Sequence, residues 1–453
     1  METKLHTLMG LLLLLIFITP SFAQEWQPVG SIGFSAGMIS EPSLAFSNTG
    51  EPYIAFSDGA HSGKVTVMKF DGSSWVMVGS PGFSTSSTLF LSLAFSNTGE
   101  PYVAFEDGGN SFRATVMKFN GSNWEAVGTP GFSTGNLAYI TLAFNGDNEP
   151  YVAYRDDGNS QKATVMKFNG TSWLTVGSEG FSAGRADYTS LAFNSLDEPY
   201  VAYRDGGNSY KATVMKFDGN SWTNVGASGF SVGVASNTSL AFSHTGELYV
   251  AYSDGGNSFK ASTMKFNGTS WENVGVAGFS IGVVANTSLA FSHTGEPYVA
   301  FRDDANAGQA AVMKFDGSNW VNVGDAGFSA GAIDDISFAF SDLGEPYVAY
   351  NDGENGNFST VMKFASTLSV GDVYASFSFT LYPNPAADVV KLGALPGAQT
   401  SIKLFDLSGK QIFIEQTTAE SLSINLRDFA AGLYLIRIEH QGSVGYKKLS
   451  IRK

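Results

Sequence analysis

The strongest constraint on the fold is a unit of 49 residues that recurs through most of the chain without insertion or deletion. The tryptophans of the chain all keep this step, standing at Trp26, Trp75, Trp124, Trp173, Trp222, Trp271 and Trp320. A phenylalanine keeps the same step from Phe70 to Phe364. A period of about 40 to 50 residues built from short apolar runs is typical of propeller blades or of a β-solenoid.

Each unit predicts four β-strands. In one copy we expect an inner strand at the Leu-Ala-Phe run 93–95, followed by strands at 102–105, at 114–119 and from Trp124 onward. Asn-Gly or Asp-Gly pairs precede the Trp strands and favour tight hairpin turns. The segments between units, such as 185–188, are expected to be loops. Together with the loops between the second and third strands, they are expected to lie on one face.

The count of strands favours a closed ring over an open stack. The last unit stops at Phe364 without a Trp strand, whereas an isolated Trp strand stands at 26–30. An open solenoid would instead end in atypical polar caps. We therefore predict an all-β fold in which residues 24–364 form a seven-bladed propeller with four-stranded blades. The segment around Trp26 is expected to complete the last blade.

Segments of different character flank the predicted propeller. Residues 1–23 are typical of a secretory signal peptide, with Lys4, an apolar run at 11–18 and small residues before the expected cleavage site. That run is shorter than the roughly 20 residues that span a bilayer. Residues 365–376 are expected to be a linker. The remainder, 377–453, is expected to form a small β-sandwich of seven strands, at 377–382, 389–392, 401–406, 411–415, 421–426, 433–440 and 446–451.

Composition excludes several classes of function. The chain has no cysteine and a net charge of -15. It therefore cannot form disulfides or a thiolate metal site. An acidic surface repels phosphate backbones and anionic lipids, so we expect neither nucleic acid nor membrane as a partner. The mature chain is expected not to insert into a membrane and to be monomeric.

The copies differ from one another chiefly in two places on the predicted loop face. One is the segment between blades, and the other is the residue before an Asp that recurs in every copy. Arginine forks and tyrosine rings at these places suit an anionic or sugar ligand. The alternative is that these positions differ between the copies only because packing does not constrain them. The candidate ligand-binding residues are Glu106, Tyr139, Arg155, Arg185, Asp187, Tyr188, Arg204 and Arg302.

Polar residues that recur in every copy favour a structural role. Asp107, Lys118 and Glu100 each have a counterpart in all seven units, and catalysis normally needs one constellation rather than seven. We expect turn-forming Asp residues and cross-strand partners. The histidines have no metal or catalytic spacing, so we predict no catalytic residues, metal or cofactor. Paired acids such as Asp334-Asp335 leave calcium binding or acid/base chemistry open.

The repeats resemble two known propeller patterns. The Gly108-Gly109 doublet, Phe119 and Trp124 are similar to the kelch repeat, although the doublet occurs in three copies and the aromatic-to-Trp spacing is shorter. The run 119–124 looks like the Asp-box of sialidases but lacks its Asp-x-Gly spacing. These likenesses support the fold and imply no activity.

The C-terminal segment contains a series of short motifs, whose residues are Tyr382, Pro383, Asn384, Pro385, Gly409, Lys410, Gly432, Tyr434, Lys447 and Lys448. With these motifs it closely resembles the type A sorting domain of the type IX secretion system. The motifs appear in that family's order along 377–453. The resemblance implies export by Bacteroidetes-type bacteria through the type IX machinery, followed by release or display on the cell surface. The alternative is a sugar-binding or immunoglobulin-like module that stays attached.

Three functions remain open at this point. The first is a binding or adhesion module that recognises an extracellular glycan or protein through its loop face. The second is an extracellular hydrolase or lyase acting on polysaccharide. The third is a structural protein of the cell surface.

Overall fold

The computed structural model describes residues 24–366, 379–396, 399–405, 411–440 and 443–452. The described residues belong to two compact units, one spanning Gln24–Ser366 and the other lying beyond the predicted linker. The predicted signal peptide, nearly all of the predicted linker, and Gly409 and Lys410 lie outside the described residues. In the described part, no helix has the length and apolar character needed to cross a bilayer.

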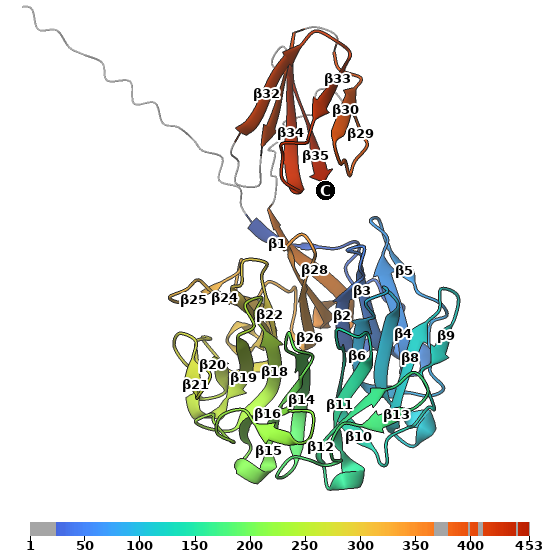
Figure 1. Ribbon diagram of the computed structural model, residues 1–453, viewed down its shortest axis with the longest axis vertical. Coiled ribbons are helices and arrows are strands. Elements are labelled where there is room, and N and C mark those ends of the chain that lie inside the picture. The colour runs from blue at the N-terminus through green and yellow to red at the C-terminus, as the bar shows by residue number, and fades with distance from the viewer. Residues whose placement is uncertain (1–23, 367–378, 397–398, 406–410, 441–442, 453) are drawn as a thin grey trace, which may run out of the picture. The chain divides into compact units, whose positions relative to one another are not determined.

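The first unit is a seven-bladed β-propeller whose blades are antiparallel sheets of four strands (Figure 1). The inner strands are β2 (Ile39–Phe46), β6 (Thr88–Phe95), β10 (Leu137–Phe144), β14 (Ala186–Phe193), β18 (Ala235–Phe242), β22 (Val284–Phe291) and β26 (Ile333–Phe340). The second strands are β3 (Pro52–Asp58), β7 (Pro101–Asp107), β11 (Pro150–Asp156), β15 (Pro199–Asp205), β19 (Leu248–Asp254), β23 (Pro297–Asp303) and β27 (Pro346–Asp352).

The third and fourth strands complete each blade. The third strands are β4 (Lys64–Phe70), β8 (Arg113–Phe119), β12 (Lys162–Phe168), β16 (Lys211–Phe217), β20 (Lys260–Phe266), β24 (Gln309–Phe315) and β28 (Phe358–Ser366). The outer strands are β5 (Trp75–Met77), β9 (Trp124–Ala126), β13 (Trp173–Thr175), β17 (Trp222–Asn224), β21 (Trp271–Asn273), β25 (Trp320–Asn322) and, from the start of the unit, β1 (Gln24–Pro28).

The ring is closed by β1, which is the outer strand of blade seven. It pairs antiparallel with β28 (Figure 1). In this pairing Trp26 lies opposite Phe364 and Pro28 lies opposite Met362. The Trp26 Nε1–H donates to the Val323 carbonyl oxygen at 2.7 Å, and its ring stacks on Phe328. The other six tryptophans make the same two kinds of contact with the connection entering their blade. The predicted closure is therefore confirmed.

Serine hydroxyls join neighbouring inner strands around the axis. The Leu93 N–H donates to Ser43 Oγ at 2.9 Å, and the Leu44 N–H donates to Ser337 Oγ at 3.0 Å across the closing seam. Inner strands are edge strands, so their free N–H groups need partners. The small serine side chain supplies one and lets seven strands approach the axis.

The Asp and Lys-Glu residues that recur in every copy have the structural roles predicted for them. Asp107 precedes a short 3-10 helix, accepts from the Gly109 N–H at 2.9 Å and accepts from Thr115 Oγ1 at 2.8 Å. A Lys of the third strand and the Glu just before the second strand pair in all seven blades, at 2.9 to 3.5 Å. The 3-10 helices are η1 (Gly59–His61), η2 (Gly108–Asn110), η3 (Asp157–Asn159), η4 (Gly206–Asn208), η5 (Gly255–Asn257), η6 (Asp304–Asn306) and η7 (Gly353–Asn355).

The inner strands are longer than predicted, and the assignment of 185–188 as a loop was wrong. Strand β14 begins at Ala186, and the corresponding residues of the other blades likewise lie in inner strands. A β-bulge interrupts the pairing there, between Asp187 and Ser190 in blade four. The bulge breaks the alternation of buried and exposed residues that marks a strand in a sequence.

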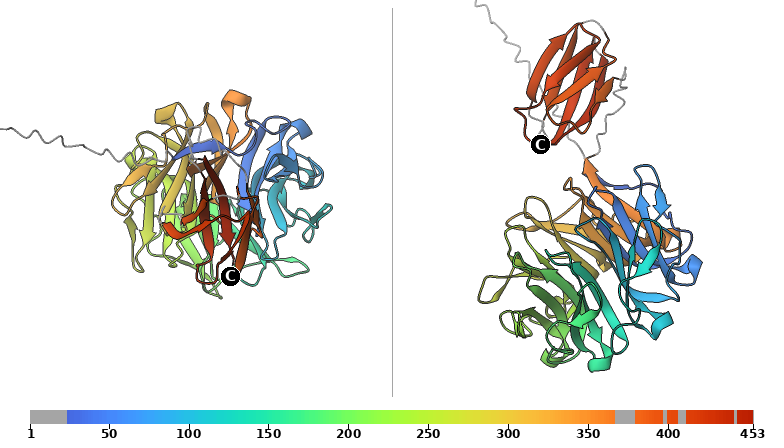
Figure 2. Two further views of the ribbon diagram at one scale, coloured as in Figure 1. Left: turned by 90° about the horizontal axis from the view of Figure 1, so that it is seen from above. Right: turned by 45° about the vertical axis from the view of Figure 1, so that its right-hand side comes forward.

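The second described unit consists of two antiparallel sheets (Figures 1 and 2). Buried side chains of both sheets, including Val390, Ile402 and Ile436, share one core. This arrangement confirms the predicted β-sandwich. One sheet contains β29 (Thr380–Tyr382), β30 (Val389–Gly393) and β33 (Ser421–Asn425). The other contains β32 (Gln411–Thr417), β31 (Thr400–Phe405), β34 (Gly432–His440) and β35 (Ser443–Ile451).

Trp26→Ala is expected to lower the free energy of unfolding by about 3–5 kcal/mol, because a buried aromatic side chain is removed. Trp173→Ala removes the same contacts inside a blade of continuous chain and should cost a similar amount. Only Trp26→Ala should also release β1, and hydrogen exchange should show faster exchange of the amides in β28. Unchanged protection of β28 in Trp26→Ala would contradict the role of β1 in closing the ring.

Candidate functional site

A cavity of about 300 Å³ lies on the propeller axis, lined by residues of all seven inner strands. The third residue of each inner strand contributes one side chain, and we call this set the axial ring. Each of these side chains is half-buried, with part of its surface free to contact a ligand. The axial ring consists of Glu41, Phe90, Tyr139, Tyr188, Asn237, Asn286 and Asp335.

The β-bulge places the axial ring residues at the cavity. In blades one to six the ring residue has a positive φ, as at Tyr139 (56°) and Tyr188 (55°). Such angles are unfavourable for bulky residues and persist only where neighbouring groups hold them. The hydroxyl of Thr189 donates to the Tyr139 carbonyl oxygen, and that of Thr238 donates to the Tyr188 carbonyl oxygen. The bulges at Tyr139 and Tyr188 are thus each held by a hydrogen bond from the next blade.

Blade seven positions its ring residue in a different way. The Asn351 side-chain oxygen accepts hydrogen bonds from the backbone N–H groups of both Asp334 and Asp335, each at 2.9 Å. Asn351 occupies the variable position before the recurring Asp. In blade seven, the residue at this variable position therefore holds the backbone of the axial ring residue Asp335 in place.

The axial ring has an aromatic arc and a polar arc. In the aromatic arc, Tyr139 lies between Phe90 and Tyr188, with ring centres 4.8 and 4.7 Å away. In the polar arc, Asn237 Nδ2 donates to Asn286 Oδ1 at 2.8 Å, and Asn286 Nδ2 donates to Asp335 Oδ1 at 3.3 Å. Glu41 completes the polar arc, since its backbone N–H donates to Asp335 Oδ2 at 3.3 Å. An apolar surface thus faces a set of hydrogen-bonding groups.

The two carboxyl groups of the polar arc resist ionisation. Burial, reinforced by the negative charge of Asp335, raises the pKa of Glu41 to about 7. Burial also raises the pKa of Asp335. No residue lining the cavity carries a positive charge. Glu41 is therefore an acid whose protonation changes near neutral pH.

Behind the aromatic arc, three arginines converge on one buried aspartate, Asp187, which has 0% exposure. Its carboxylate oxygens lie 2.9 Å from Arg155 Nη1, 2.6 Å from Arg204 Nη2 and 2.8 Å from Arg185 Nε. Burial would raise the pKa of Asp187, but the hydrogen bonds from the arginines outweigh it and lower that pKa. The guanidinium groups are thus engaged within the protein.

The arginines also contact the tyrosines of the axial ring. The Arg155 guanidinium carbon is 5.3 Å from the centre of the Tyr139 ring, and that of Arg204 is 4.9 Å from the centre of the Tyr188 ring. These contacts are cation–π interactions. The arginines thereby support the aromatic arc from outside the cavity. Direct contact of Arg155 or Arg204 with a ligand stays a prediction.

The remaining two candidates differ in their positions. Glu106 is 7% exposed, and burial together with the charge of Asp157 raises its pKa to about 7. Among the described residues, its Oε2 has no hydrogen-bond partner. Arg302 belongs to another part of the ring, where it pairs with Asp304 at 3.2 Å and Asp334 at 3.7 Å. The structure thus brings six of the eight candidates into one cluster, places Glu106 near Arg155, and leaves Arg302 apart.

Sequence reasoning missed five members of the axial ring: Glu41, Phe90, Asn237, Asn286 and Asp335. Each is the last residue of one of the variable segments between copies. The signal was present in the alignment of the copies with one another. The expectation of a loop obscured it, because a loop gives no reason for one position to point toward the axis.

A second cavity, of about 630 Å³, lies between blades four and five and is larger. Its lining includes Tyr200, Lys216, Phe242 and Glu247, which recur in every blade, and Leu248 where the other blades have Pro. Lys216 is paired with Glu198 at 3.4 Å. The axial cavity is the stronger candidate because the residues that differ between blades converge there.

Within the described ranges, no group of three His, Asp or Glu side chains is placed to hold a metal ion. In blade three, Asp156 accepts from the Gly158 N–H and from Thr164 Oγ1. Its neighbour Asp157 instead pairs with Arg155 at 3.0 Å. The two carboxylates are therefore engaged in separate interactions.

The C-terminal unit matches a known family. Residues 380–452 match the model described as a secretion system C-terminal sorting domain. The chain therefore carries a type IX sorting domain, which marks it for export to the cell surface or for secretion. Association with the secretion machinery fits this domain. A search of curated proteins found no match.

Several solved structures are similar to the chain. One is PorZ, an essential surface component of the type IX secretion system of Porphyromonas gingivalis, with 15% identity and a TM-score of 0.49. The match covers 94% of this chain and 61% of PorZ, so this chain spans about three fifths of that protein. A PL25 ulvan lyase is 12% identical over 75% of this chain and 96% of its own, with a TM-score of 0.51.

A third similar structure is the Aleuria aurantia lectin AAL, solved with a fucosylated sugar. It is 15% identical over 66% of this chain and 100% of its own, with a TM-score of 0.44. At these identities a structural match supports no more than the fold. The function must be inferred from the site itself.

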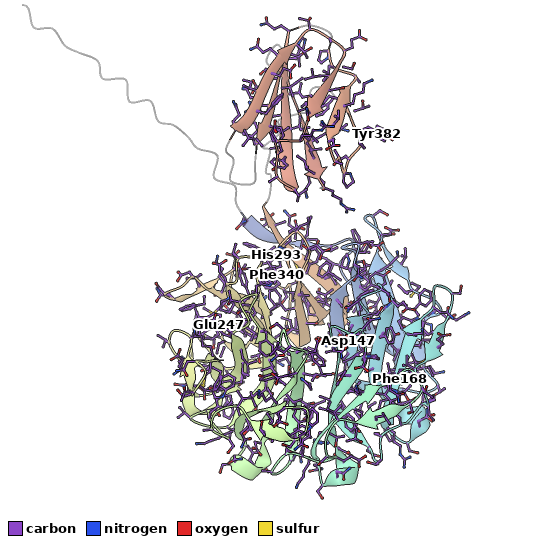
Figure 3. The ribbon with its side chains drawn as sticks, viewed as in Figure 1. Asp147, Phe168, Glu247, His293, Phe340 and Tyr382 are labelled. Carbon is purple, nitrogen blue, oxygen red and sulfur yellow. The ribbon has the colours of Figure 1, made fainter. Side chains whose placement is uncertain are left out.

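The motif residues of the sorting domain hold its first strand region against its last strand. Asn384 Nδ2 donates to the Lys448 carbonyl oxygen, and Asn384 Oδ1 accepts from the Ser450 N–H, both at 2.8 Å. The neighbouring Pro383 and Pro385 follow cis peptide bonds. Tyr382 in edge strand β29 is 77% exposed (Figure 3). In contrast, Tyr434 is buried and donates to the Ala430 carbonyl oxygen at 2.9 Å.

The other motif residues with described positions lie on β34 and β35. Gly432 begins β34 and pairs with Ile451, while Lys447 and Lys448 are exposed on β35. The Lys447 ammonium lies 5.6 Å from the centre of the Phe379 ring. Strand β35 is an edge strand of the four-stranded sheet, and β34 lies between it and β31.

Asp187→Asn is expected to lower the free energy of unfolding at pH 7 by about 3–5 kcal/mol, because three half-buried arginines lose their common buried anion. The pKa of Asp187 is lowered in the folded state. The ionised Asp187 therefore stabilises the folded state fully at pH values above about 4, the ordinary pKa of an aspartate. This stabilisation is lost as the pH falls below that value. Urea unfolding at pH 7 and pH 3 measures both effects.

Asp157→Asn is the matched control for Asp187→Asn. Asp157 is 32% exposed and pairs with Arg155 alone among the salt bridges of the described residues, so its loss should cost about 0–1 kcal/mol. Equal losses in the two variants would contradict a central role for Asp187.

Glu41→Gln is expected to stabilise the protein at pH 8 relative to the parent, and much less at pH 5. Folding raises the pKa of Glu41 from 4.5 to about 7, so ionisation of Glu41 destabilises the folded state as the pH rises through this interval. The difference should reach roughly 2 kcal/mol after allowance for solvent screening. Urea unfolding across this pH range tests it, with the exposed Glu272→Gln as a control that should show no such trend.

Proposed function

We propose that the propeller is a carbohydrate-binding module of the cell surface or the extracellular medium, and that its ligand occupies the cavity of the axial ring. The observation that carries this proposal is the aromatic arc facing a polar arc across one cavity. A sugar has the same two-sided character, with C–H groups on its faces and hydroxyl groups around its edge. Export by the sorting domain would bring this site to extracellular glycans.

The aromatic arc suits the face of a sugar ring. Phe90, Tyr139 and Tyr188 form a continuous surface, with neighbouring ring centres less than 5 Å apart. Aromatic rings offer a large apolar area with little loss of conformational freedom on binding. The arginines behind the two tyrosines further restrict their motion. The surface is thus organised before a ligand arrives, which reduces the cost of binding.

The polar arc suits the hydroxyl groups of a sugar. Asn237 and Asn286 offer both donors and acceptors, while Glu41 and Asp335 offer acceptors when ionised. Pockets that bind small ligands combine apolar walls with a few placed polar groups and typically have volumes from about 300 Å³. The axial cavity lies at the lower limit of this range. It would accommodate one sugar residue of a longer chain.

Extracellular polysaccharide hydrolysis or cleavage by a lyase is a second candidate function. It is favoured by the pKa of Glu41, which lies near 7 next to the acidic Asp335. A carboxyl group with such a pKa can exchange protons with a substrate near neutral pH. New reducing ends or unsaturated products released from a bound polysaccharide would support this function over binding alone. A structural surface role would be indicated if no glycan binds.

Tyr139→Ala and Tyr188→Ala are expected to weaken glycan binding by about tenfold each, because each removes about 1–1.5 kcal/mol of aromatic contact. The full chain is screened on a glycan array, and the affinity for the best ligand is then measured by calorimetry. Leu196→Ala is the control, since Leu196 is 78% exposed in the turn of the opposite face. Retained affinity in both tyrosine variants would reject the axial cavity as the binding site.

A further inference from the structure

The axial cavity has two carboxyl groups in its lining and no positively charged side chain beside them. Glu41 and Asp335 contribute carboxyl groups, and no lysine, arginine or histidine is among the lining residues. The Glu41 backbone N–H is within 3.3 Å of the Asp335 carboxylate, so the two acids are immediate neighbours on the ring. Such a site disfavours an anionic ligand and gains Coulomb energy from a cation.

The arginines near the cavity do not change this balance. Arg155, Arg185 and Arg204 all place guanidinium nitrogens within 2.9 Å of the buried Asp187 carboxylate. Arg155 also pairs with Asp157. On the other side of the ring, Arg302 is directed toward Asp304 and Asp334. The positive charges are therefore largely neutralised within the protein.

A third buried acid strengthens the negative field. Glu106 of β7 is more than nine-tenths buried and its Oε2 has no hydrogen-bond partner in the described part of the chain. Its charge lies close enough to Glu41 to disfavour ionisation of that group. Burial of an oxygen that has no hydrogen-bond partner is costly. A cation in the cavity would reduce the repulsion among these acids.

Aromatic faces adjoin the acidic part of the ring. Phe90 of blade two follows Glu41 of blade one around the axis, and Tyr139 lies next, with its ring centre 4.8 Å from that of Phe90. The faces of aromatic rings attract ammonium groups. Carboxylates next to aromatic rings therefore combine two sources of attraction for the same kind of ligand group.

We propose that the axial cavity selects a glycan with a free ammonium group, an amino sugar, over neutral sugars and uronic acids. Glu41 and Asp335 bind the ammonium group, and the aromatic arc contacts the sugar face. Asn237 and Asn286 bind hydroxyl groups. This inference rests on the proposed carbohydrate-binding function and specifies its ligand class.

The test compares soluble oligomers of glucosamine, N-acetylglucosamine and galacturonic acid, matched in length, by calorimetry with the full chain at low ionic strength. The glucosamine oligomer should bind about tenfold or more tightly than its N-acetylated counterpart, which carries no charge. The galacturonic acid oligomer should bind most weakly. Increasing salt should reduce the preference for glucosamine.

Glu41→Gln and Asp335→Asn should each reduce glucosamine binding by about tenfold and should reduce binding of the N-acetylated oligomer much less, because that oligomer has no ammonium group to pair with the carboxylates. Both substitutions preserve side-chain size, and thermal unfolding verifies that each variant is folded. Glu272→Gln is the matched control, because it removes the same charge from the exposed outer strand β21. An equal loss in Glu272→Gln would overturn the proposal by showing a general effect of net charge.

The possible failures can be distinguished from one another. Equal binding of glucosamine and N-acetylglucosamine, with both still lost in Tyr139→Ala, would overturn the selection for ammonium and leave the carbohydrate-binding function intact. Absence of binding to every sugar would overturn both proposals. A lysine oligopeptide that binds as tightly as the glucosamine oligomer would overturn the amino sugar in favour of a basic peptide.

Discussion

Closure of the ring by β1 is the interaction on which the rest of the structure depends. Blade seven receives three strands from the end of the propeller and one from its beginning. Trp26 makes the same hydrogen bond and stacking contact at this seam that the other tryptophans make between blades continuous in sequence. All seven junctions are thus nearly equivalent. This equivalence keeps the inner strands at one height and brings their third residues to the same level on the axis.

The repeat made most of the fold predictable from the sequence, whereas the site depended on a local irregularity. The period of Trp26 and its counterparts predicted the blade count and the closure. The inner strands began earlier than predicted because the bulge at Tyr188 breaks the alternation expected of a strand. Tyr139 and Tyr188 were identified as candidates, but their neighbours Glu41 and Asp335 were not. Their convergence is a property of the closed ring and of the bulge together.

The arginine cluster illustrates a second limit of sequence reasoning. Arg155 and Arg204 occupy equivalent positions in adjoining blades, which suggested a shared ligand. In the structure both bind Asp187, an acid that stands one residue before Tyr188. Charged residues on loops and strand ends can form ion pairs with one another as readily as with a ligand. The outcome depends on which groups face each other, and this cannot be read from the order of the residues.

The regular spacing of the blades has a consequence for how recognition could diversify. Each blade contributes a single side chain to the axial ring, and the backbone around it is shared by nearly all copies. The chemistry of the cavity is therefore set by seven side chains, one from each blade, in the order Glu-Phe-Tyr-Tyr-Asn-Asn-Asp around the axis. Exchange of whole blades by recombination would change which side chains line the cavity and would leave the backbone of the propeller unaltered. A repertoire of specificities is thus accessible to this architecture without any new fold.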